Sequence, residues 1–435
     1  MQKYIVRTLF TLYLHKRHML LSFLCFIWIT GIFTLIPSFH ALAANRTYHA
    51  EEYGVNGIDK KDDTAAIQYL LDMANPEDHI TIVFPKGTYY ISKTLLIQSN
   101  TTLQLHPQAV ICRSKDGISK NMLRTVDSKK NSGRIGKYNL AKNITIQGGT
   151  WHGGNISLSK KNCNLIYIGH SQNIVIRDAT IKNYHGSHAI EFAGVKNATV
   201  KNCKFTGFRY DQRKFASEAI QIDVCHKIGD VHWTSGFKAD KTPCKNIKIY
   251  NNTFIDCPRA VGSHNVLRGH YSKNIIIANN KIKRSSPSMQ SKAVTGIYLM
   301  GTSDVIVRDN TIEGYSYGLI AKSNKNLHIF KNTFKYCTMI PYSISGSGKS
   351  NGTRNFVIEN FDQETNELEI ACPGFQKIKM TIKGKSYTIN VKDGIAKCTL
   401  KSSIRNGEKA SFYAKDSNGN KVYKNRWIQP RATQE

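Results

Sequence analysis

Apolar and polar residues alternate with a period of two in a group of short segments that share one pattern. Each segment starts with Asn or Asp, continues with alternating aliphatic residues and ends with an aromatic residue or Ile. The seven segments start at Asn143, Asn173, Asn197, Asn246, Asn274, Asp304 and Asn326. Such alternation is typical of a strand with one buried face. Because the strands recur every 22 to 49 residues, we predict coils that stack into a parallel β-helix solenoid.

An asparagine follows four of these strands at a single register. The four residues are Asn252, Asn280, Asn310 and Asn332. Asparagine tolerates left-handed turns and forms hydrogen bonds with nearby backbone groups. Stacked coil over coil, these side chains are predicted to form a ladder inside the solenoid.

A second strand follows the first in most coils, and aligning its copies sorts their residues into columns, because side chains alternate between the two faces. The inward column contains Ile166, Ile190, Ile220, Val261, Ile297 and Leu319. The next column points outward and contains Tyr167, Glu191, Gln221, Gly262, Tyr298 and Ile320. A further outward column contains Gly169, Ala193, Asp223, His264, Met300 and Lys322. Just before the strand stand His188, Glu218, Arg259, Thr295 and Tyr317.

Both ends of the predicted solenoid carry a different pattern. Asp62 and Asp63 are typical helix-start residues, and the apolar stripe that begins at Ile67 has helical spacing. It predicts a helix that covers the open end of the solenoid. Near the C-terminus, short alternating segments are separated by Lys-Gly, Asp-Gly and Asn-Gly turns. The predicted fold class is therefore all-β: a β-helix over residues 44–350 with an N-terminal capping helix, and a small antiparallel β-sandwich over residues 351–435.

The first 43 residues do not belong to either predicted domain. Basic residues precede an apolar run from Met19 to Ile36, and Ala41-Leu42-Ala43 then supplies a small-residue cleavage pattern. We interpret this segment as a secretory signal peptide. An uncleaved anchor is the rival interpretation, because the apolar run is almost long enough to span a bilayer. Both place the remainder outside the cell, secreted or associated with the cell wall, and after cleavage we expect no contact with the membrane.

Composition narrows the class of partner. The chain has 61 Lys and Arg residues against 30 Asp and Glu residues, which gives a formal net charge of +31. A surface this basic favours anionic partners such as an acidic polysaccharide, teichoic acid or nucleic acid. The simpler interpretation is a cationic exported protein held near an anionic wall. The lysines are scattered along the chain and no nucleic-acid motif accompanies them, so nucleic acid is not expected. We expect a monomer.

The ten cysteines show no metal-binding spacing, so zinc is not predicted. Cys203, Cys257 and Cys337 occupy similar repeat positions, which suits buried free thiols at least as well as disulfides. The segments RDN and DQETNE do not resemble an EF-hand loop. A calcium site stays possible, but no motif in the sequence supports one. No metal site and no cofactor is predicted.

The column alignment brings acidic residues and histidines together on neighbouring coils. Glu191, Glu218 and Asp223 lie on two adjacent coils, His264 stacks one coil beyond Asp223, and His188 lies beside the register of Glu218. Neighbouring coils are about 4.8 Å apart, so these side chains are expected to share a shallow cleft. Stacked carboxylates repel, which supplies an acid beside a base. Any one of them alone is more often a solvated outward residue, but the cluster favours a catalytic site.

Other outward residues near this cluster suit substrate binding. Arg259, Lys322 and Tyr298 are candidates for holding an anionic or stacked sugar, and His188 and Gln221 stand beside the acids. A pair of carboxyl groups separated by about 6.5 to 9.5 Å would suit inverting glycoside hydrolysis.

The opening of the mature chain resembles that of the pectin-lyase-like β-helix superfamily. The resemblance rests on YGVNGIDKKDDTAAIQYLLDMA and on TIVFPKGTYYISKTLLIQSNTTLQL, and it extends over roughly residues 50 to 340. It implies a right-handed β-helix and carbohydrate-active chemistry. The order of the coils is similar to that of the family 28 glycoside hydrolases, the polygalacturonases, which implies that EAIQID contributes Asp223 and Glu218, and that VGSHN contributes His264.

The chain departs from the family 28 pattern at two places. The paired aspartates are absent, and TGIYLM stands where Arg-x-Lys is expected. Three hypotheses therefore stay open. The first is a polysaccharide hydrolase that uses Glu218 and Asp223. The second is a lyase or epimerase acting on a uronic acid polymer, with His264, Arg259 and Lys322 as candidates. The third is a non-catalytic wall- or glycan-binding protein.

Overall fold

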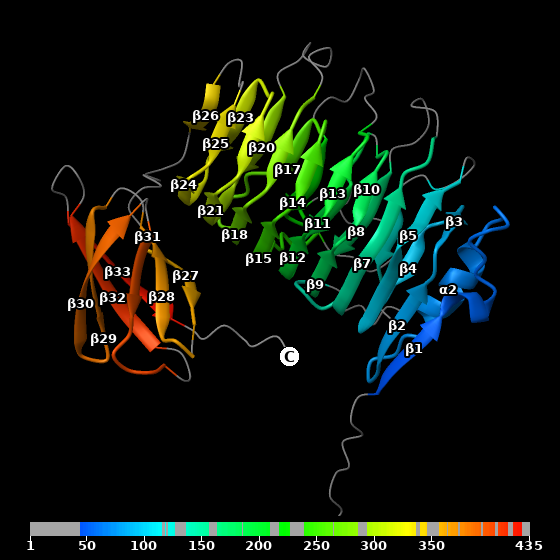
Figure 1. The fold of residues 1–435 in the computed structure, drawn as a ribbon, viewed down its shortest axis with the longest axis horizontal. Helices are drawn as coiled ribbons and strands as arrows, with labels where there is room; N and C mark the ends of the chain where they lie inside the picture. The colour runs from blue at the N-terminus through cyan, green and yellow to red at the C-terminus, as the bar shows by residue number, and fades with distance from the viewer. Residues whose placement is uncertain are drawn as a thin grey trace, which may run out of the picture. The chain divides into compact units, whose positions relative to one another are not determined.

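The repeats fold into a solenoid of parallel strands, shown as a computed structural model in Figure 1. The predicted all-β fold with parallel coils is confirmed, since the strands of successive coils pair in parallel and in register. The structure describes residues 44–114, 118, 121–126, 136–155, 163–184, 186–208, 217–226, 239–263, 265–285, 294–335, 340–345, 356–362, 364–372, 375–392, 395–404, 408–415 and 421–428. The proposed signal peptide lies outside these residues.

One face of the solenoid is a nine-stranded parallel sheet, which we call sheet B. Its strands follow the chain in order along the solenoid (Figure 1). They are β4 (Leu95–Ile97), β6 (Asn121–Thr125), β8 (Asn164–Gly169), β11 (Ile190–Ala193), β14 (Glu218–Asp223), β17 (Arg259–Gly262), β20 (Thr295–Met300), β23 (Tyr317–Lys322) and β26 (Ile340–Ser345). These are the second strands of the coils, so sheet B carries the columns predicted from the sequence.

The rest of the coils form a 17-stranded sheet, which we call sheet A and which consists of two rows joined by the long strands β5 and β7. The first row is β1 (Asn45–His49), β2 (His79–Phe84), β5 (Thr101–Arg113), β7 (Lys142–His152), β9 (Gln172–Arg177), β12 (Lys196–Lys201), β15 (Lys245–Tyr250), β18 (Ser272–Ala278), β21 (Thr302–Arg308) and β24 (Lys325–Phe330). The second row adds β3 (Gly87–Ile91), β10 (Thr180–Lys182), β13 (Lys204–Thr206), β16 (Thr253–Ile255), β19 (Lys281–Lys283), β22 (Thr311–Glu313) and β25 (Thr333–Lys335).

The inward side chains of both sheets fill one apolar core, which includes residues from Ala50 to Leu327. The short 3-10 helix η1 (Ala50–Tyr53) and the helix α2 (Thr64–Asp72) precede the coils. Ile67 and two leucines of α2 are buried in this core, so the predicted helix packs against the first coils. The backbone N–H of Thr64 donates to Asp62 Oδ1 at 3.0 Å.

Asparagine side chains connect the coils of sheet A both inside and outside. The predicted inner ladder is confirmed: Asn280 Nδ2 donates to Asn310 Oδ1 at 2.9 Å, and Asn252 Nδ2 donates to Asn280 Oδ1 at 3.0 Å. An outer ladder links the residues that start the repeats; for example, Asn173 Nδ2 donates to Asn143 Oδ1 at 3.0 Å. The outer asparagines have left-handed backbone conformations near φ +58, which asparagine adopts more readily than other side chains.

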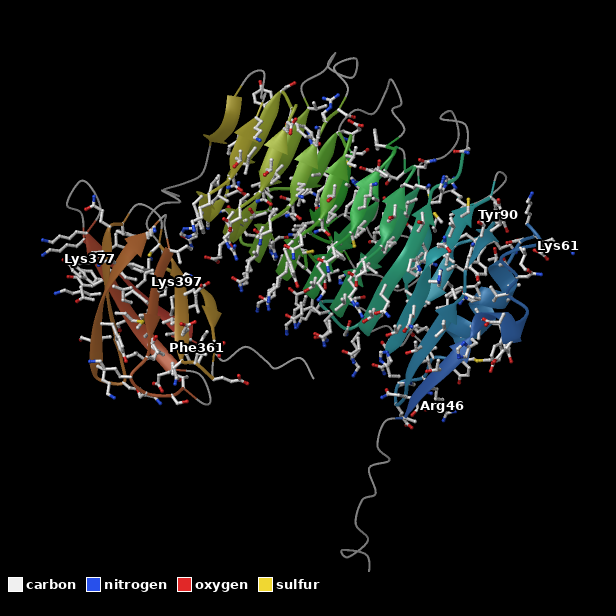
Figure 2. The ribbon with its side chains drawn as sticks, in the orientation of Figure 1. Arg46, Lys61, Tyr90, Phe361, Lys377 and Lys397 are labelled. Atoms are coloured by element: carbon white, nitrogen blue, oxygen red, sulfur yellow. The ribbon has the colours of Figure 1, made fainter. Side chains whose placement is uncertain are left out.

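The C-terminal strands form a separate antiparallel sheet around their own apolar core. In the described residues it is one seven-stranded sheet, because β30 pairs with β29 along most of its length and with β31 at its end. The strands are β27 (Val357–Phe361), β28 (Glu367–Ala371), β29 (Lys377–Ile382), β30 (Lys385–Lys392), β31 (Ile395–Thr399), β32 (Glu408–Lys415) and β33 (Lys421–Ile428). Lys377 and Lys397 mark two of these strands in Figure 2. Within the part of the chain that the structure describes, no helix has the length and apolarity needed to cross a membrane.

Candidate functional site

The strand register of sheet B aligns the side chains as predicted from the sequence. Ile190 pairs with Ile166 and Ile220, and Glu191 pairs with Tyr167 and Gln221. The same columns continue across β17, β20 and β23. Glu218 is the first residue of β14 and does not precede the strand, as the alignment had placed it. His264 lies outside the described residues, so its predicted position beside Asp223 stays a prediction.

Glu218 forms a buried ion pair at the edge of the candidate site. Its side chain is 1% exposed, and its Oε1 accepts a hydrogen bond from Arg259 Nη1 at 2.7 Å. His188 Nδ1 lies 3.4 Å from Glu218 Oε2 and 3.1 Å from the backbone oxygen of Glu218. Burying a carboxylate is unfavourable unless it is paired, and these two side chains supply the pairing.

Gly262 provides the space in which Glu218 lies. A Cβ atom at Gly262 would be 2.5 Å from Cγ of Glu218 and 3.1 Å from the backbone oxygen of Tyr298. Real Cβ atoms do not approach carbon atoms this closely, so a larger residue would displace Glu218. The glycine in the outward column therefore helps to position the ion pair.

Asp223 is held by donors on both carboxylate oxygens. Gln221 Nε2 donates to Oδ2 at 2.8 Å, and the backbone N–H of Val224 donates to Oδ1 at 2.8 Å. Asn265 Nδ2 also donates to Oδ1. The side chain is fixed in one orientation, and Asp223 as a whole is only 2% exposed.

Glu191 is held in a similar way one coil earlier. Asn164 Nδ2 donates to Glu191 Oε2 at 2.5 Å and lies 3.1 Å from Asn121 Oδ1. Asn164 Oδ1 accepts from the hydroxyl of Ser187 and from the backbone N–H of His188 at 2.9 Å. Asn164 thus connects Glu191 to the segment that carries His188.

A row of cations and an aromatic ring lies beside these acids and reaches the surface. The Arg259 guanidinium lies 4.3 Å from the centre of the Tyr298 ring, within cation–π distance. Lys322 Nζ lies 6.0 Å from the same ring, and Lys322 is exposed. This row offers positive charge and an aromatic ring at the surface, while the carboxylates stay beneath it.

The predicted shallow cleft of acids is therefore wrong in one respect. Glu191, Glu218, Gln221 and Asp223 are each less than a tenth exposed and do not line an open surface. The reason is that neighbouring coils supply hydrogen-bonding side chains that cover them, above all Asn164 and Asn265. Neither asparagine was among the predicted site residues. For Asn164 a signal was available, because it begins β8 just as Glu218 begins β14; for Asn265 none was.

Among the described residues, no three His, Cys, Asp or Glu side chains are arranged to hold a metal ion. The carboxylate oxygens of Asp223 and Glu218 accept hydrogen bonds from protein donors instead.

The fold and this site define the class of protein. Residues 142–363, more than half of the chain, match the family model described as a right handed beta helix region, and the chain belongs to that family. Residues 48–147 match the model described as rhamnogalacturonase A/epimerase, pectate lyase-like. The resemblance to pectin-lyase-like proteins that the opening motif indicated is confirmed.

Two relatives and one solved structure illustrate the similarity. The plasmin and fibronectin-binding protein A of Streptococcus pneumoniae is 27% identical over 317 residues, which are 65% of this chain and 42% of that protein. The iota-carrageenase of Alteromonas macleodii is 23% identical over 185 residues, which are 42% of this chain and 30% of that enzyme. The chain thus spans less than half the length of these two relatives. A solved structure of the Streptococcus pneumoniae surface protein and adhesin PfbA has a TM-score of 0.51 at 20% identity, covering 69% of this chain and 89% of that chain.

Proposed function

We propose that this protein is an extracellular, monomeric carbohydrate-active enzyme that binds an acidic polysaccharide on the outward face of sheet B and hydrolyses it. The match to a pectate-lyase-like family model and the similarity to a carrageenase support a polysaccharide ligand. The basic composition of the chain supports an anionic one. The C-terminal sheet is proposed as a separate accessory domain.

The observation that carries the proposal is that carboxylates are buried on the outward face of sheet B, where the fold does not require buried charges. The inward face of sheet B already supplies the apolar core, so outward residues are free to be neutral or solvated. Instead Glu191, Glu218 and Asp223 are 8%, 1% and 2% exposed, respectively, and each has dedicated donors. Buried ionisable groups held by specific partners are typical of functional sites.

The geometry suggests different roles for the acids. Glu218 is committed to Arg259, so we assign it to positioning Arg259 and His188 beside the ligand. In the part of the chain that the structure describes, Asp223 is held by neutral donors alone, and we assign it to proton transfer, with Glu191 one coil away as the second carboxylate. General acid–base catalysis needs such fixed groups within reach of the ligand. His264 is proposed as an additional catalytic residue.

The surface row is proposed to hold the sugar chain. Tyr298 offers a ring for stacking against a sugar, and Arg259 and Lys322 offer positive charge to its acidic groups. Gln221 and His188 complete the set of proposed binding residues. The same cations would also neutralise a uronate carboxylate during elimination, which keeps a lyase or epimerase as the second candidate function.

A panel of acidic and neutral glycans tests the proposal. Polygalacturonate, alginate, hyaluronate, iota-carrageenan and a neutral glucan are incubated with the protein, and new reducing ends and ultraviolet absorbance are followed. Hydrolysis creates a reducing end without absorbance, whereas elimination creates an unsaturated, absorbing sugar. We expect reducing ends from at least one acidic glycan. Asp223→Asn is expected to lower the rate by about 100-fold or more, the usual contribution of an acid–base group.

Asp304→Asn is the matched control. Asp304 accepts from Asn326 in the outer ladder, where the other repeats carry asparagine, so the variant is expected to keep full activity and folding. Products that absorb ultraviolet light would overturn the proposal of hydrolysis in favour of elimination. If the Asp223→Asn variant still binds a glycan and no glycan yields a product, the proposal of an enzyme is overturned in favour of a binding protein. The similarity to an adhesin would suggest that outcome.

A further inference from the structure

Lysines that are far apart in the sequence form a column where the first-row strands of sheet A begin. Lys196 pairs with Lys245, and Lys245 pairs with Lys273, on three consecutive coils. The same register continues to Lys142 through Gln172 and to Lys325 through Ser303. Five of the seven positions in this register are therefore lysine. We call these five residues the lysine column.

The column extends along the axis of the solenoid. Adjacent strands are about 4.8 Å apart, so seven positions extend over roughly 29 Å. The expectation of scattered lysines, drawn from the sequence, is wrong for this face. Residues separated by 22 to 49 positions are brought into line because every coil adds one strand in parallel register.

The outer asparagine ladder fixes the backbone beside the column. Each of Lys142, Lys196, Lys245 and Lys273 directly precedes a ladder asparagine. In the middle of the column, Asn246 Nδ2 donates to the preceding ladder asparagine at 2.8 Å. The lysine backbones are therefore held at constant spacing, while the side chains remain exposed or half-buried.

Among the described residues, no carboxylate neutralises these charges. Elsewhere on sheet A, basic residues have acidic partners, such as Lys283 with Glu313 at 3.5 Å and Arg308 with Asp309 at 2.5 Å. Within the described ranges, none of the five column lysines forms an ion pair; Lys325 Nζ lies instead 4.5 Å from the Tyr271 ring. Like charges placed opposite one another on paired strands repel, so the column lacks the compensation found elsewhere on the same sheet.

We propose that the lysine column is a binding surface for a linear acidic polysaccharide that lies along the solenoid axis. An extended chain with one negative charge per sugar would relieve the repulsion at several coils at once. The proposal goes beyond the proposed function, because the column is on sheet A and does not depend on catalysis at sheet B.

Three features favour a polysaccharide over a nucleic acid. The phosphates of one nucleic acid strand repeat every 3.4 Å or so, which does not match the strand spacing of about 4.8 Å. The column also consists of lysines alone, without the arginine forks that recognise phosphate through two parallel hydrogen bonds. Stacking aromatic residues, which single-stranded nucleic acid sites use, are absent from the seven positions.

The test is direct binding with a triple variant and a charge-matched control. Lys196→Gln, Lys245→Gln and Lys273→Gln are combined in one protein. The control combines Lys377→Gln, Lys379→Gln and Lys385→Gln, which are exposed residues of the C-terminal sheet; Lys377 is labelled in Figure 2. Both variants lose three positive charges. Binding of polygalacturonate, a neutral glucan and single-stranded DNA is measured by calorimetry at several salt concentrations, with all variants in an Asp223→Asn background to prevent turnover.

We expect the column variant to bind polygalacturonate about tenfold or more weakly and with a shallower salt dependence, because fewer counterions are released. The control triple is expected to change the affinity less than about twofold. Equal losses in both triples would overturn the proposal, since binding would follow net charge. Tighter binding of single-stranded DNA than of polygalacturonate would overturn it in favour of a nucleic acid surface.

Cleavage of a short oligosaccharide distinguishes a failure of the lysine-column proposal from a failure of the proposed function. The column variant with Asp223 intact should still cleave a short oligosaccharide at the wild-type rate, because no column residue belongs to sheet B. Loss of polymer binding with unchanged cleavage is the result we expect. An unchanged affinity for polygalacturonate, whatever the cleavage rate, would contradict the column alone.

Discussion

The charged side chains of the two sheets of this solenoid differ in whether they are buried and paired. On sheet B, Glu218 and Asp223 are buried and each is held by specific partners. On sheet A, Lys196, Lys245 and Lys273 are aligned and accessible, and no carboxylate of the described residues pairs with them. Both faces lie over the same apolar core, so the difference does not follow from the needs of the fold.

This difference separates two kinds of function on one scaffold. A buried, fully bonded network fixes the orientation of a few side chains, which suits chemistry at one point. An open column of like charges fixes only spacing, which suits contact with a long ligand at many points. Substitutions on sheet B should therefore change stability and activity, whereas substitutions in the lysine column should change only binding.

The largest effect is expected from breaking the ion pair on sheet B. Glu218→Ala removes the partner of Arg259 and leaves a partly buried guanidinium beside an empty space. Removing one member of a buried pair usually costs about 3 to 5 kcal/mol. We therefore expect the free energy of unfolding to fall by about 3 kcal/mol, measured by chemical denaturation followed by circular dichroism.

Glu313→Ala is the control for this prediction. Glu313 pairs with Lys283 at 3.5 Å on sheet A, and the two side chains are 26% and 56% exposed. An exposed pair of this kind contributes less than about 1 kcal/mol. Equal changes in the two variants would show that the ion pair on sheet B is no more important than a surface pair, and the contrast between the faces would be lost.

The two asparagine ladders repeat the contrast inside sheet A. Asn280 is 1% exposed; its side chain donates to Asn310 and to the backbone oxygen of Ile249, and accepts from Asn252. Asn280→Ala leaves several buried groups without partners, each worth about 1 to 3 kcal/mol. We expect a loss of about 3 kcal/mol in the free energy of unfolding.

Asn173→Ala in the outer ladder is the comparison. Asn173 is exposed, so water can replace its bond to Asn143, and a loss of about 1 kcal/mol is expected, including the cost of a left-handed backbone without asparagine. The stabilities of the two variants are compared by measuring their denaturation midpoints. If the outer variant is the less stable one, the inner ladder does not hold the coils together.

Much of the fold could be predicted because it depends on local periodicity. Alternation in each repeat identified the strands, and the fixed register of Asn252 and Asn280 identified the inner ladder. Aligning copies of a strand also placed Glu191, Gln221 and Gly262 correctly, since a parallel solenoid pairs each copy with the next.

The candidate site and the lysine column were harder to predict from the sequence, because both depend on neighbouring residues that differ from coil to coil. Asn265 follows its strand outside any repeat, so its bond to Asp223 had no signal in the sequence. The lysines had a signal, because they directly precede repeat asparagines, but the sequence alone does not show that their strands pair side by side. Burial was the least predictable quantity, since it depends on what the neighbouring coils place above each strand.

A smaller effect is expected from filling the space beside Glu218. Gly262→Ala places a methyl group 2.5 Å from Glu218 Cγ, and overpacking of this kind usually costs about 1 to 3 kcal/mol. The displaced carboxylate would also loosen Arg259 over Tyr298. We expect a lower denaturation midpoint and weaker glycan binding together. A lower midpoint with unchanged binding would separate the ion pair from the surface row.

The smallest effect is expected from the thiols that lie beneath the two faces. Burial raises the pKa of Cys244, which lies 3.2 Å from the backbone oxygen of Asp223, to about 12, and it raises the pKa values of Cys203 and Cys257 under sheet A to about 12 as well. A thiolate is the reactive form, so at about pH 8 these thiols should be almost inert in the native protein and react readily once it is unfolded. Labelling with iodoacetamide, read by mass spectrometry, tests this. Because the interior is shared, all three should be equally protected; selective labelling of Cys244 would show that sheet B opens to solvent, and that its buried carboxylates become accessible by local motion.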